Sequence, residues 1–421
     1  MIFRQFVDED LGCGSYLVGD KGEAAVVDPA FAIEQYVEAA EAEGLRIVRV
    51  LESHTHADHL SGHGRFALEH GVPVSIHPLA RPEYPFDALS DGDVVRVGGV
   101  EIRVLHTPGH RPEHCAFVVD GALALTGDSL FVGEAARPDL AIEAREGATD
   151  LYRSLHRLGE LADAVVVYPG HMGGSLCGTN MSDERSTSIG RERKTNRAFN
   201  ESEHAFVDES SSITTPRPPT TERLVALNRG PWVAARPPLE EIDDAGDATV
   251  LDVRPVDEFA AGHAPGAISV ALDGGSFATR SAFVLDAAER IAIHARSSDE
   301  ARRAASHLWS VGLFETVGYL SERAGTERTQ TLTVPEFAHL RGTPQVLDVR
   351  EDSEREEERL PGAIEIPYRL VRIAPPPDLD PKRPVYVICA SGARATLAAS
   401  VLARDGFDAR PVVGGGVSDL K

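Results

Sequence analysis

The segment ESHTHADHLSGH, residues 52–63, holds four histidines and one aspartate and directly follows the apolar stretch IVRVL. If the backbone stays extended, His54 and His56 point to the same side, because side chains alternate along a strand. Asp58 and His59 then follow on the turn. Imidazole and carboxylate groups are the usual nitrogen and oxygen ligands of metal ions. The segment therefore predicts a metal site at a strand end rather than a solvated surface loop.

Three further candidate ligands lie downstream, each just past the end of an apolar stretch. His110 follows EIRVL within LHTPGHRPEH, Asp128 follows GALAL within TGDSL, and His171 follows DAVVV within YPGHMGG. Proteins with α/β folds place their functional residues beyond the ends of strands, so we expect these side chains to meet the first segment. The other histidines of this region are expected to be surface or hydrogen-bonded residues: His63, His70, His77, His106 and His114.

Composition narrows the classes of partner. The chain of 421 residues has 42 Lys and Arg against 66 Asp and Glu, a net charge of −24. This balance argues against nucleic acid or an anionic membrane as a partner, because the phosphate contribution to binding would be repulsive. No stretch approaches the roughly 18 apolar residues of a membrane span, and the start has no apolar signal region. Four dispersed cysteines without a CxxC pair favour a reducing, cytoplasmic location.

Local patterns predict an α/β organisation of the first 200 residues. SYLVGDKGEAAVVDP (15–29) predicts a hairpin about its Gly-Asp-Lys-Gly turn, and AIEQYVEAAEAEG (32–44) predicts an amphipathic helix that ends at Gly44. DESSSITTPRPPTTE (208–222) is rich in Ser, Thr and Pro, and we predict a linker or an exposed excursion there.

Beyond that segment the chain repeats itself. TVLDVRPVDEF (249–259) matches QVLDVREDSER (345–355), and APGAI (264–268) matches LPGAI (360–364) at the same offset. A repeat of roughly 90 residues indicates two tandem copies of one domain rather than the shorter units of a solenoid.

The second copy carries a candidate nucleophile. VYVICASGARATLAA (385–399) predicts a buried strand, a tight loop and a helix, with Cys389 where the strand ends. Backbone N–H groups of the loop and the N-terminus of the helix would stabilise a thiolate, which is the nucleophilic form. Arg394 adds a cation near the mouth of the loop.

The first copy lacks these groups. IAIHARSSDEARRAA (291–305) aligns with the second copy so that Ala295 faces Cys389 and Glu300 faces Arg394. Alanine has no nucleophilic side chain, so we expect this copy to be inactive and to serve packing, spacing or docking.

The histidine pattern resembles the metallo-β-lactamase superfamily, whose HxHxDH motif stands here as His54-Thr-His56-Ala-Asp58-His59. His110 matches the superfamily's third histidine, Asp128 its bridging aspartate and His171 its last histidine. The resemblance implies an αββα sandwich with the metal at the edge of two packed sheets.

Within that superfamily, two short segments of the sequence resemble the persulfide dioxygenases most closely. Members of that branch use one Fe(II) ion. By resemblance the iron ligands are His54, His110 and Asp128, and the remaining donors of the pattern form a second shell or a second site: His56, Asp58, His59 and His171. ARPDL (136–140) resembles a GRxDx segment of that branch, with Ala136 in place of Gly, and suggests Arg137 and Asp139 as substrate contacts. The motif PGHR (108–111) has Arg111 at a position where PGHT, with threonine, is commoner in the family. GSLCGTNMSDERSTSIGRERKTN (174–196) resembles the stretch found in dioxygenases fused to sulfurtransferases.

The loop Cys389-Ala-Ser-Gly-Ala-Arg394 resembles the active loop of rhodaneses. The expected organisation is therefore a dioxygenase domain at 1–230, an inactive rhodanese-like domain at 236–324 and an active one at 332–421, both with parallel sheets. Among the other cysteines, we expect Cys115 in the core and assign no role to Cys13 or Cys177, although Cys177 lies near the predicted pocket.

The fusion favours an enzyme that oxidises a small-thiol persulfide, such as glutathione persulfide, with O₂ to sulfite and thiol. Cys389 would transfer sulfane sulfur, making or using thiosulfate. The alternative is a glyoxalase II-like thioester hydrolase with two zinc ions and an attached sulfurtransferase. A third hypothesis is that the chain has no catalytic activity and binds persulfide as a sensor or scaffold. Relatives of these folds lead us to expect a homo-oligomer.

Overall fold

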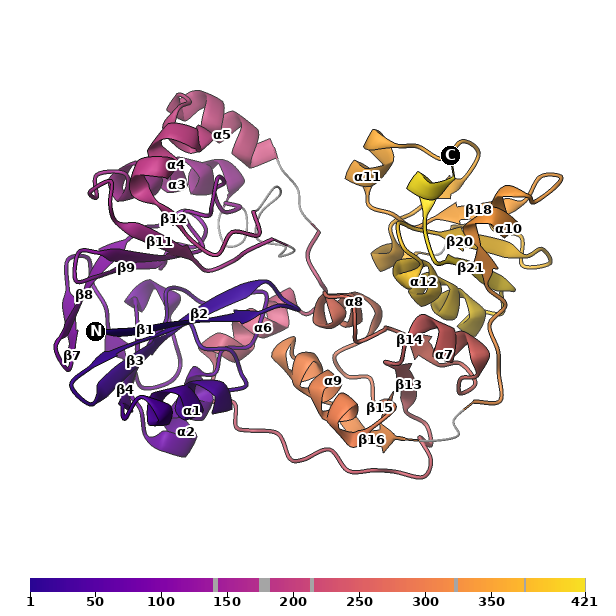
Figure 1. Cartoon of the computed structure of the whole chain (residues 1–421), viewed down its shortest axis with the longest axis horizontal. Helices are drawn as coiled ribbons and strands as arrows, with labels where there is room; N and C mark the ends of the chain where they lie inside the picture. The colour runs from indigo at the N-terminus through magenta and orange to yellow at the C-terminus, as the bar shows by residue number, and fades with distance from the viewer. Residues whose placement is uncertain (139–142, 174–181, 213–215, 322–324, 375, 421) are drawn as a thin grey trace. The chain divides into compact units, whose positions relative to one another are not determined.

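The computed structural model describes residues 1–421 except 139–142, 174–181, 213–215, 322–324, 375 and 421. The chain divides into two compact units. One comprises Met1–Arg236 with Ser310–Gly312, and the other comprises Pro237–Trp309 with Leu313–Lys421. Figure 1 traces both along the chain. No helix of the described residues is both long and apolar enough to cross a membrane.

The first unit is built on two six-stranded sheets. The first sheet has the order β1-β2-β3-β4-β5-β6. Its strands are β1 (Ile2–Asp8), β2 (Cys13–Asp20), β3 (Glu23–Val27), β4 (Arg46–Leu51), β5 (Val74–Ile76) and β6 (Asp87–Ala88). The second sheet has the order β12-β11-β10-β9-β8-β7. Its strands are β7 (Val94–Val97), β8 (Val100–His106), β9 (Cys115–Val119), β10 (Leu123–Gly127), β11 (Val166–Pro169) and β12 (Thr187–Ser188).

Helices cover the outer face of each sheet. Their bounds are α1 (Glu34–Ala42), α2 (His63–His70), α3 (Ala144–Leu158), α4 (Ile189–Thr195), α5 (Glu203–Ser212) and α6 (Thr221–Arg229). Tyr36 of α1 and Phe66 of α2 pack on the first sheet, whereas Leu151 of α3 and Phe206 of α5 pack on the second. Figure 1 shows α1 and α2 on one side of the unit and α3, α4 and α5 on the other.

Between the sheets lies a separate core in which side chains from both, such as Val27 and Phe117, are fully buried. The layer order is therefore αββα, and the predicted fold class of this unit is confirmed.

Two local predictions for the first sheet are confirmed with adjusted bounds. The hairpin joins β2 to β3 through Lys21 and Gly22, whose φ angles of +49° and +83° are those of a type I′ turn. The amphipathic helix is α1, which is shorter than the predicted 32–44, and Gly44 lies two residues beyond it at φ +66°.

The predicted linker at 208–222 is wrong at both ends. Residues up to Ser212 belong to α5, and α6 begins at Thr221. Phe206 and Val207 anchor α5 in the core beside α3, and Ser210 on the next turn is buried. Tertiary packing of two apolar side chains therefore overrides the low helix propensity of the Ser-rich stretch.

The second unit contains two parallel sheets, with the orders β14-β13-β15-β16 and β17-β21-β20-β18-β19. The first comprises β13 (Thr249–Asp252), β14 (Ile268–Ser269), β15 (Ile291–His294) and β16 (Thr316–Leu320). The second comprises β17 (Leu332–Thr333), β18 (Gln345–Asp348), β19 (Ile364–Glu365), β20 (Val385–Ile388) and β21 (Ala409–Val413). The helices are α7 (Val256–Ala261), α8 (Phe277–Val284), α9 (Ser298–Ser310), α10 (Val334–Ala338), α11 (Asp352–Glu357) and α12 (Ala393–Arg404).

The two copies follow the same path at every matched motif. Asp252 ends β13 and Asp348 ends β18, and each strand pairs with the strand that precedes the candidate loop. The predicted parallel α/β fold of both repeats is confirmed.

Candidate functional site

Four strand ends bring the predicted ligands of the first unit together. The segment with His54 follows β4, and His110 lies in the turn between β8 and β9. Asp128 follows β10 directly, and His171 follows β11 after one residue. β10 and β11 are parallel neighbours, so their carboxyl ends lie at the same edge of the sheet.

His54, His110 and Asp128 form one buried cluster. Asp128 Oδ2 lies 3.4 Å from His110 Nε2 and 4.0 Å from His54 Nε2, and each residue is 1% exposed. His54 Nε2 and both Asp128 carboxylate oxygens are buried without a hydrogen-bond partner. Leaving such atoms unpaired in a protein interior is unfavourable unless a cation binds them. Two imidazoles and one carboxylate are donors that suit Fe(II) or Zn²⁺, so these residues fit a metal.

Neighbouring groups orient these donors. His110 donates from Nδ1 to the carbonyl oxygen of Arg137 at 3.0 Å, which leaves Nε2 as the lone-pair atom that faces Asp128. His54 Nδ1 lies 2.9 Å from the Ser53 hydroxyl oxygen. Such contacts fix the tautomer and the ring orientation of a metal-binding histidine.

His114 holds the backbone of Asp128 in place through a hydrogen bond. The Asp128 backbone N–H donates to His114 Nε2 at 2.9 Å, and the other ring nitrogen lies 2.8 Å from the Thr107 hydroxyl oxygen. Burial, together with the neighbouring His110, lowers the pKa of His114 to about 3, so the ring stays neutral and can accept this bond. His114 is hydrogen-bonded, as predicted. Its contact with the candidate ligand Asp128 could not be predicted from the local sequence.

The electrostatics of the cluster favour a metal-binding state. Burial lowers the pKa of His54 and of His110, which keeps both imidazoles neutral. Burial opposes ionisation of Asp128, but His171 and His110 outweigh it and hold the pKa of this carboxyl below its usual range. Neutral imidazole and ionised carboxylate are the forms that bind a cation.

His56 does not join this cluster. Its Nε2 lies 3.1 Å from Glu52 Oε2 and 3.4 Å from Asp28 Oδ1, and its ring lies 4.3 Å from that of His54. Burial alone would lower the pKa of His56, but the two carboxylates outweigh it and raise that pKa. Glu52 also accepts a hydrogen bond from the Ser61 hydroxyl at 2.5 Å. His56 and Ser61 of the segment 52–63 therefore contact the same buried carboxylate.

Asp58, His59 and His171 form a second cluster beside the first. Asp58 Oδ2 lies 3.2 Å from His59 Nδ1 and 3.3 Å from His171 Nε2. His171 Nε2 also lies 3.2 Å from Asp128 Oδ2, so the two clusters are adjacent.

The structure describes only one of the two suggested substrate contacts, Arg137 and Asp139. Arg137 is buried, with 7% of its surface exposed, and its carbonyl orients His110. Asp139, like Cys177, lies outside the described residues.

Cys389 lies in a cradle of backbone amides at the end of β20. Its sulfur accepts hydrogen bonds from the N–H groups of Gly392 at 3.1 Å and Ser391 at 3.5 Å. Gly392 has φ +101° and directly precedes α12, so the thiol lies near the N-terminus of that helix. Oriented N–H groups at a helix N-terminus stabilise an anion.

Arg394 is held by a carboxylate that sequence analysis missed. Its guanidinium makes two hydrogen bonds, of 2.6 and 2.7 Å, to Glu354 of α11. Burial disfavours the Glu354 carboxylate, but Arg394 outweighs burial and lowers the pKa of that carboxyl. The ion pair fixes the guanidinium and offsets part of its charge.

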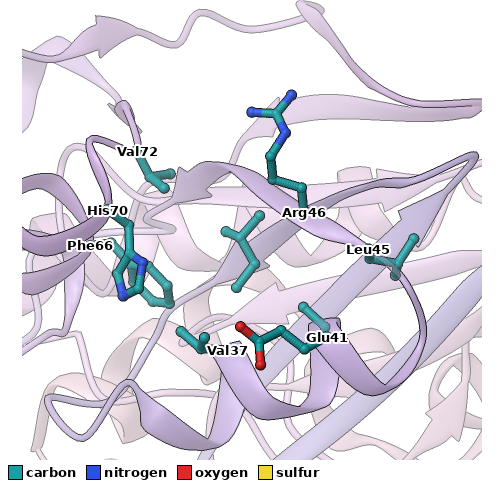
Figure 2. A pocket seen from close by; sticks show the side chains of 9 residues that line it. Val37, Glu41, Leu45, Arg46, Phe66, His70 and Val72 are labelled. Atoms are coloured by element: carbon teal, nitrogen blue, oxygen red, sulfur yellow. The ribbon is translucent and has the colours of Figure 1, made fainter.

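The described residues also line pockets away from the histidine clusters. One of about 600 Å³ borders the Cys389 loop at Ser391 and Gly392 and is also lined by Asp257 of α7. Another, of about 420 Å³, lies on the outer side of the first sheet. Figure 2 shows Val37 and Glu41 on one side of it and Phe66 and His70 on another. Its lining includes none of the candidate ligands.

Residues 9–171 match the metallo-beta-lactamase superfamily, and residues 237–322 and 333–421 match the rhodanese-like domain. Mitochondrial persulfide dioxygenase ETHE1 of Bos taurus is 28% identical over 44% of this chain and 74% of its own length. A hydroxyacylglutathione hydrolase of Alkalilimnicola ehrlichii is 39% identical over 35% of this chain, and the match spans 56% of that protein.

Solved structures extend the comparison. A metallo-beta-lactamase from Staphylococcus aureus aligns with a TM-score of 0.69 and 27% identity, over 76% of this chain and 98% of that one. ETHE1 from Myxococcus xanthus aligns with a TM-score of 0.50 and 30% identity, over 54% and 98%.

Proposed function

Because the chain belongs to the metallo-β-lactamase superfamily through its first unit and carries two rhodanese-like domains, we propose that it is a persulfide dioxygenase joined to a sulfurtransferase. One observation carries the proposal. The same chain holds a buried His-His-Asp cluster with unpartnered donor atoms and a cysteine cradled by backbone amides. The first suits oxidation of a sulfur compound at a metal, and the second suits sulfur transfer.

The proposed substrate is a small-thiol persulfide such as glutathione persulfide. In the net reaction one persulfide, RSSH, reacts with one O₂ and one water to give the thiol RSH, sulfite and two protons. The proposed cofactor is one Fe(II) per chain, which when bound would supply coordination positions for O₂ and for a substrate sulfur.

The chain's own residues have distinct roles in this proposal. His54 Nε2 and the Asp128 carboxylate, which lack hydrogen-bond partners, hold the metal together with His110 Nε2, which faces that carboxylate. Contacts of the Arg137 carbonyl and His114 keep two of these ligands in place. Burial of the cluster excludes bulk water. The side chains of Arg137 and Asp139 are proposed substrate contacts.

Cys389 is the proposed sulfur carrier. Its thiolate attacks the outer sulfur of a persulfide and releases the thiol, which leaves Cys389 as a persulfide. Sulfite then attacks the outer sulfur, so the S–S bond to Cys389 breaks and thiosulfate leaves. The amides of Ser391 and Gly392 stabilise the anionic sulfur in each state, and Arg394 draws the anions to the loop. The same steps in reverse would take sulfur from thiosulfate.

A thioester hydrolase with two zinc ions is the second candidate. It is favoured by the second donor cluster, Asp58, His59 and His171, and by the similarity to hydroxyacylglutathione hydrolases. A hydrolase of this kind gives the sulfur carrier no evident substrate, which is why the dioxygenase ranks first.

The deciding experiment is O₂ uptake by Fe(II)-loaded, anaerobically purified protein given glutathione persulfide, with sulfite and thiosulfate counted. We expect iron-dependent uptake that is lost in Asp128→Ala. Asp120→Asn, at an exposed turn outside the cluster, is the matched control and should retain uptake. No uptake, together with two zinc ions per chain and hydrolysis of a hydroxyacyl-glutathione thioester, would replace the dioxygenase by the hydrolase.

A further inference from the structure

A pocket of about 600 Å³ lies beside the Cys389 loop, and both rhodanese-like copies of the second unit line it. The active copy contributes part of the loop itself, Ser391 and Gly392. The inactive copy contributes one face of α7, and the segment between the copies adds two hydroxyl groups: Asp257 and Ala260, with Thr329 and Thr331. The copy that lacks a nucleophile therefore forms a wall next to the nucleophile of the other copy.

The segment between the copies holds this wall in place. The backbone N–H of Thr329 donates to the Ala260 carbonyl oxygen at 3.1 Å, and the Thr329 hydroxyl oxygen lies 3.0 Å from His263 Nε2. Three residues further on, β17 begins and pairs in parallel with β21 of the active copy. The segment is thus bonded to the inactive copy at one end and to the active copy at the other, which fixes the two sides of the pocket.

The inactive copy also packs on the elements that surround the Cys389 loop. The backbone N–H of Ser269 donates to the Ser400 hydroxyl oxygen at 3.0 Å, and Ser400 lies on α12, the helix that follows the loop. The Phe283 ring of α8 meets the Tyr368 ring edge to face, with 6.2 Å between the ring centres. These contacts hold the two copies together independently of the segment that joins them.

The pocket reaches the residues that touch the reacting sulfur. The N–H groups of Ser391 and Gly392 donate to Cys389 Sγ at 3.5 and 3.1 Å, and the same two residues line the pocket. A molecule in the pocket would therefore contact the residues that bond the sulfur. The pocket volume falls within the range of about 300–1,000 Å³ that is typical of small-molecule sites.

Asp257 gives the pocket its charge. It is the one ionisable side chain among the described residues that line the pocket, and it is exposed. In the part of the chain that the structure describes, no cation pairs with it, whereas the adjacent Glu258 lies 4.0 Å from Arg254 Nη1. Arg394, the proposed attractor of thiosulfate and sulfite, is not among the lining residues. The pocket therefore favours a cationic group, unlike the site of the sulfur anions.

We propose that this pocket holds the organic part of the thiol that exchanges sulfur with Cys389, and that Asp257 of the inactive copy selects thiols that carry a protonated amine. The inference rests on the proposed sulfur transfer and names the class of its acceptor. The acceptor thiolate RS⁻ attacks the outer sulfur of the Cys389 persulfide. The S–S bond to Cys389 breaks, which gives RSS⁻ and the Cys389 thiolate. Asp257 takes no part in these bond changes and acts on the amine alone.

The test uses three thiol acceptors that differ mainly in charge at one end: cysteamine, 2-mercaptoethanol and 3-mercaptopropionate. Transfer from saturating thiosulfate is measured for the full chain, Asp257→Asn and Asp257→Lys. The ratio of kcat/KM in variant and parent is taken for each acceptor, because this ratio cancels the intrinsic reactivity of the thiol.

We expect cysteamine to lose about two- to fivefold in Asp257→Asn and about five- to twentyfold in Asp257→Lys, mainly through KM. The neutral 2-mercaptoethanol should change less than about 1.5-fold in Asp257→Asn. The anionic 3-mercaptopropionate should gain about two- to fivefold in Asp257→Lys. Asp405→Lys, at an exposed carboxylate beyond the far end of α12, is the matched control and should leave all three values within about 1.5-fold of the parent.

Transfer from thiosulfate to cyanide separates this inference from the proposed function. Cyanide has no organic part to place in the pocket, so both Asp257 variants should equal the parent within about twofold, and this also shows that they are folded. Cyanide transfer that survives Cys389→Ser would contradict the proposed sulfur carrier. Cys389-dependent transfer with the same kcat/KM ratio for all three thiols would overturn the role of Asp257 and leave the carrier in place.

Discussion

The two rhodanese-like copies share a framework but differ at one loop. In the first, Arg254 Nη2 bonds Asp252 at 2.6 Å and the carbonyl oxygen of Gly262 at 2.7 Å. In the second, Arg350 Nη2 bonds Asp348 and the carbonyl oxygen of Glu358, both at 2.7 Å. The buried ion pair that begins each repeat is thus conserved in geometry between the copies, at the same spacing along the chain.

The loops after β15 and β20 have opposite charge arrangements. In the second copy two N–H groups point at the Cys389 sulfur. In the first, the corresponding Ala295 offers a methyl group, and Glu300 accepts a hydrogen bond from Arg296 N at 2.6 Å. The Glu300 carboxylate therefore occupies one backbone N–H of this loop, at the position that corresponds to Ala390 of the second copy. The rhodanese-like framework therefore persists in a copy that lacks the nucleophile. The fold depends on strands and ion pairs, whereas the nucleophile and its hydrogen-bond donors depend on one loop.

Removing the nucleophile should abolish the difference between the copies. Cys389→Ser is expected to lower sulfur transfer from thiosulfate to a thiol acceptor at least about 1,000-fold, since a serine hydroxyl cannot carry the sulfane sulfur. Steady-state transfer assays on the full chain measure this, with Cys115→Ser as the control. Transfer that survives Cys389→Ser would contradict the assignment of the carrier.

Adding a thiol to the first copy should not restore transfer. Ala295→Cys in the Cys389→Ser chain is expected to stay below about 1% of parental transfer, because the Glu300 carboxylate repels a thiolate and occupies a loop N–H. The same assay decides it. Recovery of transfer would mean that the first copy lacks only the cysteine.

Removing the cation of the second loop should have an intermediate effect. Arg394→Ala is expected to lower kcat/KM for thiosulfate about tenfold to a hundredfold, since the amides of Ser391 and Gly392 remain and Glu354 already offsets part of the charge. Arg410→Ala, at an arginine that pairs with Asp408 away from the loop, is the control and should change kcat/KM by less than about twofold. An unchanged value in Arg394→Ala would exclude a role in binding the anion.

The loop backbone should tolerate substitution poorly. A Cβ at Gly392 meets Val413 Cα at 2.9 Å, and the residue has φ +101°. Gly392→Ala is expected to destabilise the chain by about 2–4 kcal/mol, whereas Gly406→Ala, with φ +88° and open space, should cost about 1–2 kcal/mol. Chemical unfolding of both variants provides the comparison, and equal losses would show that the contact with Val413 is readily relieved.

The smallest expected effect is a pH dependence in the framework of the first copy. Burial disfavours the Asp252 carboxylate, but His294 and Arg254 outweigh it and lower its pKa. The resulting stabilisation is present above about pH 4 and is lost as pH falls through the folded-state pKa. Asp252→Asn should cost about 1–3 kcal/mol at pH 7, and thermal unfolding should show this deficit shrinking below pH 4. A deficit that is constant with pH would contradict this account.

Short-range patterns were enough to predict much of this molecule. Alternation and turn residues predict the β2–β3 hairpin, and the spacing of HxHxDH predicts a ligand-rich segment after a strand. The internal repeat predicts two similar parallel sheets, with Cys389 facing Ala295. These features succeed because each depends on residues that are close in sequence or on direct comparison of two segments.

Tertiary structure alone decided the contacts that join distant segments. It turns His56 toward Asp28 and Glu52, pairs Arg394 with Glu354 and sets Cys13 beside Asp58. It also draws the Ser-rich stretch before Ser212 into α5. Nothing in local sequence specifies such partners, because they depend on which strand ends the sheets bring to one edge and on which buried charges then need a counterpart.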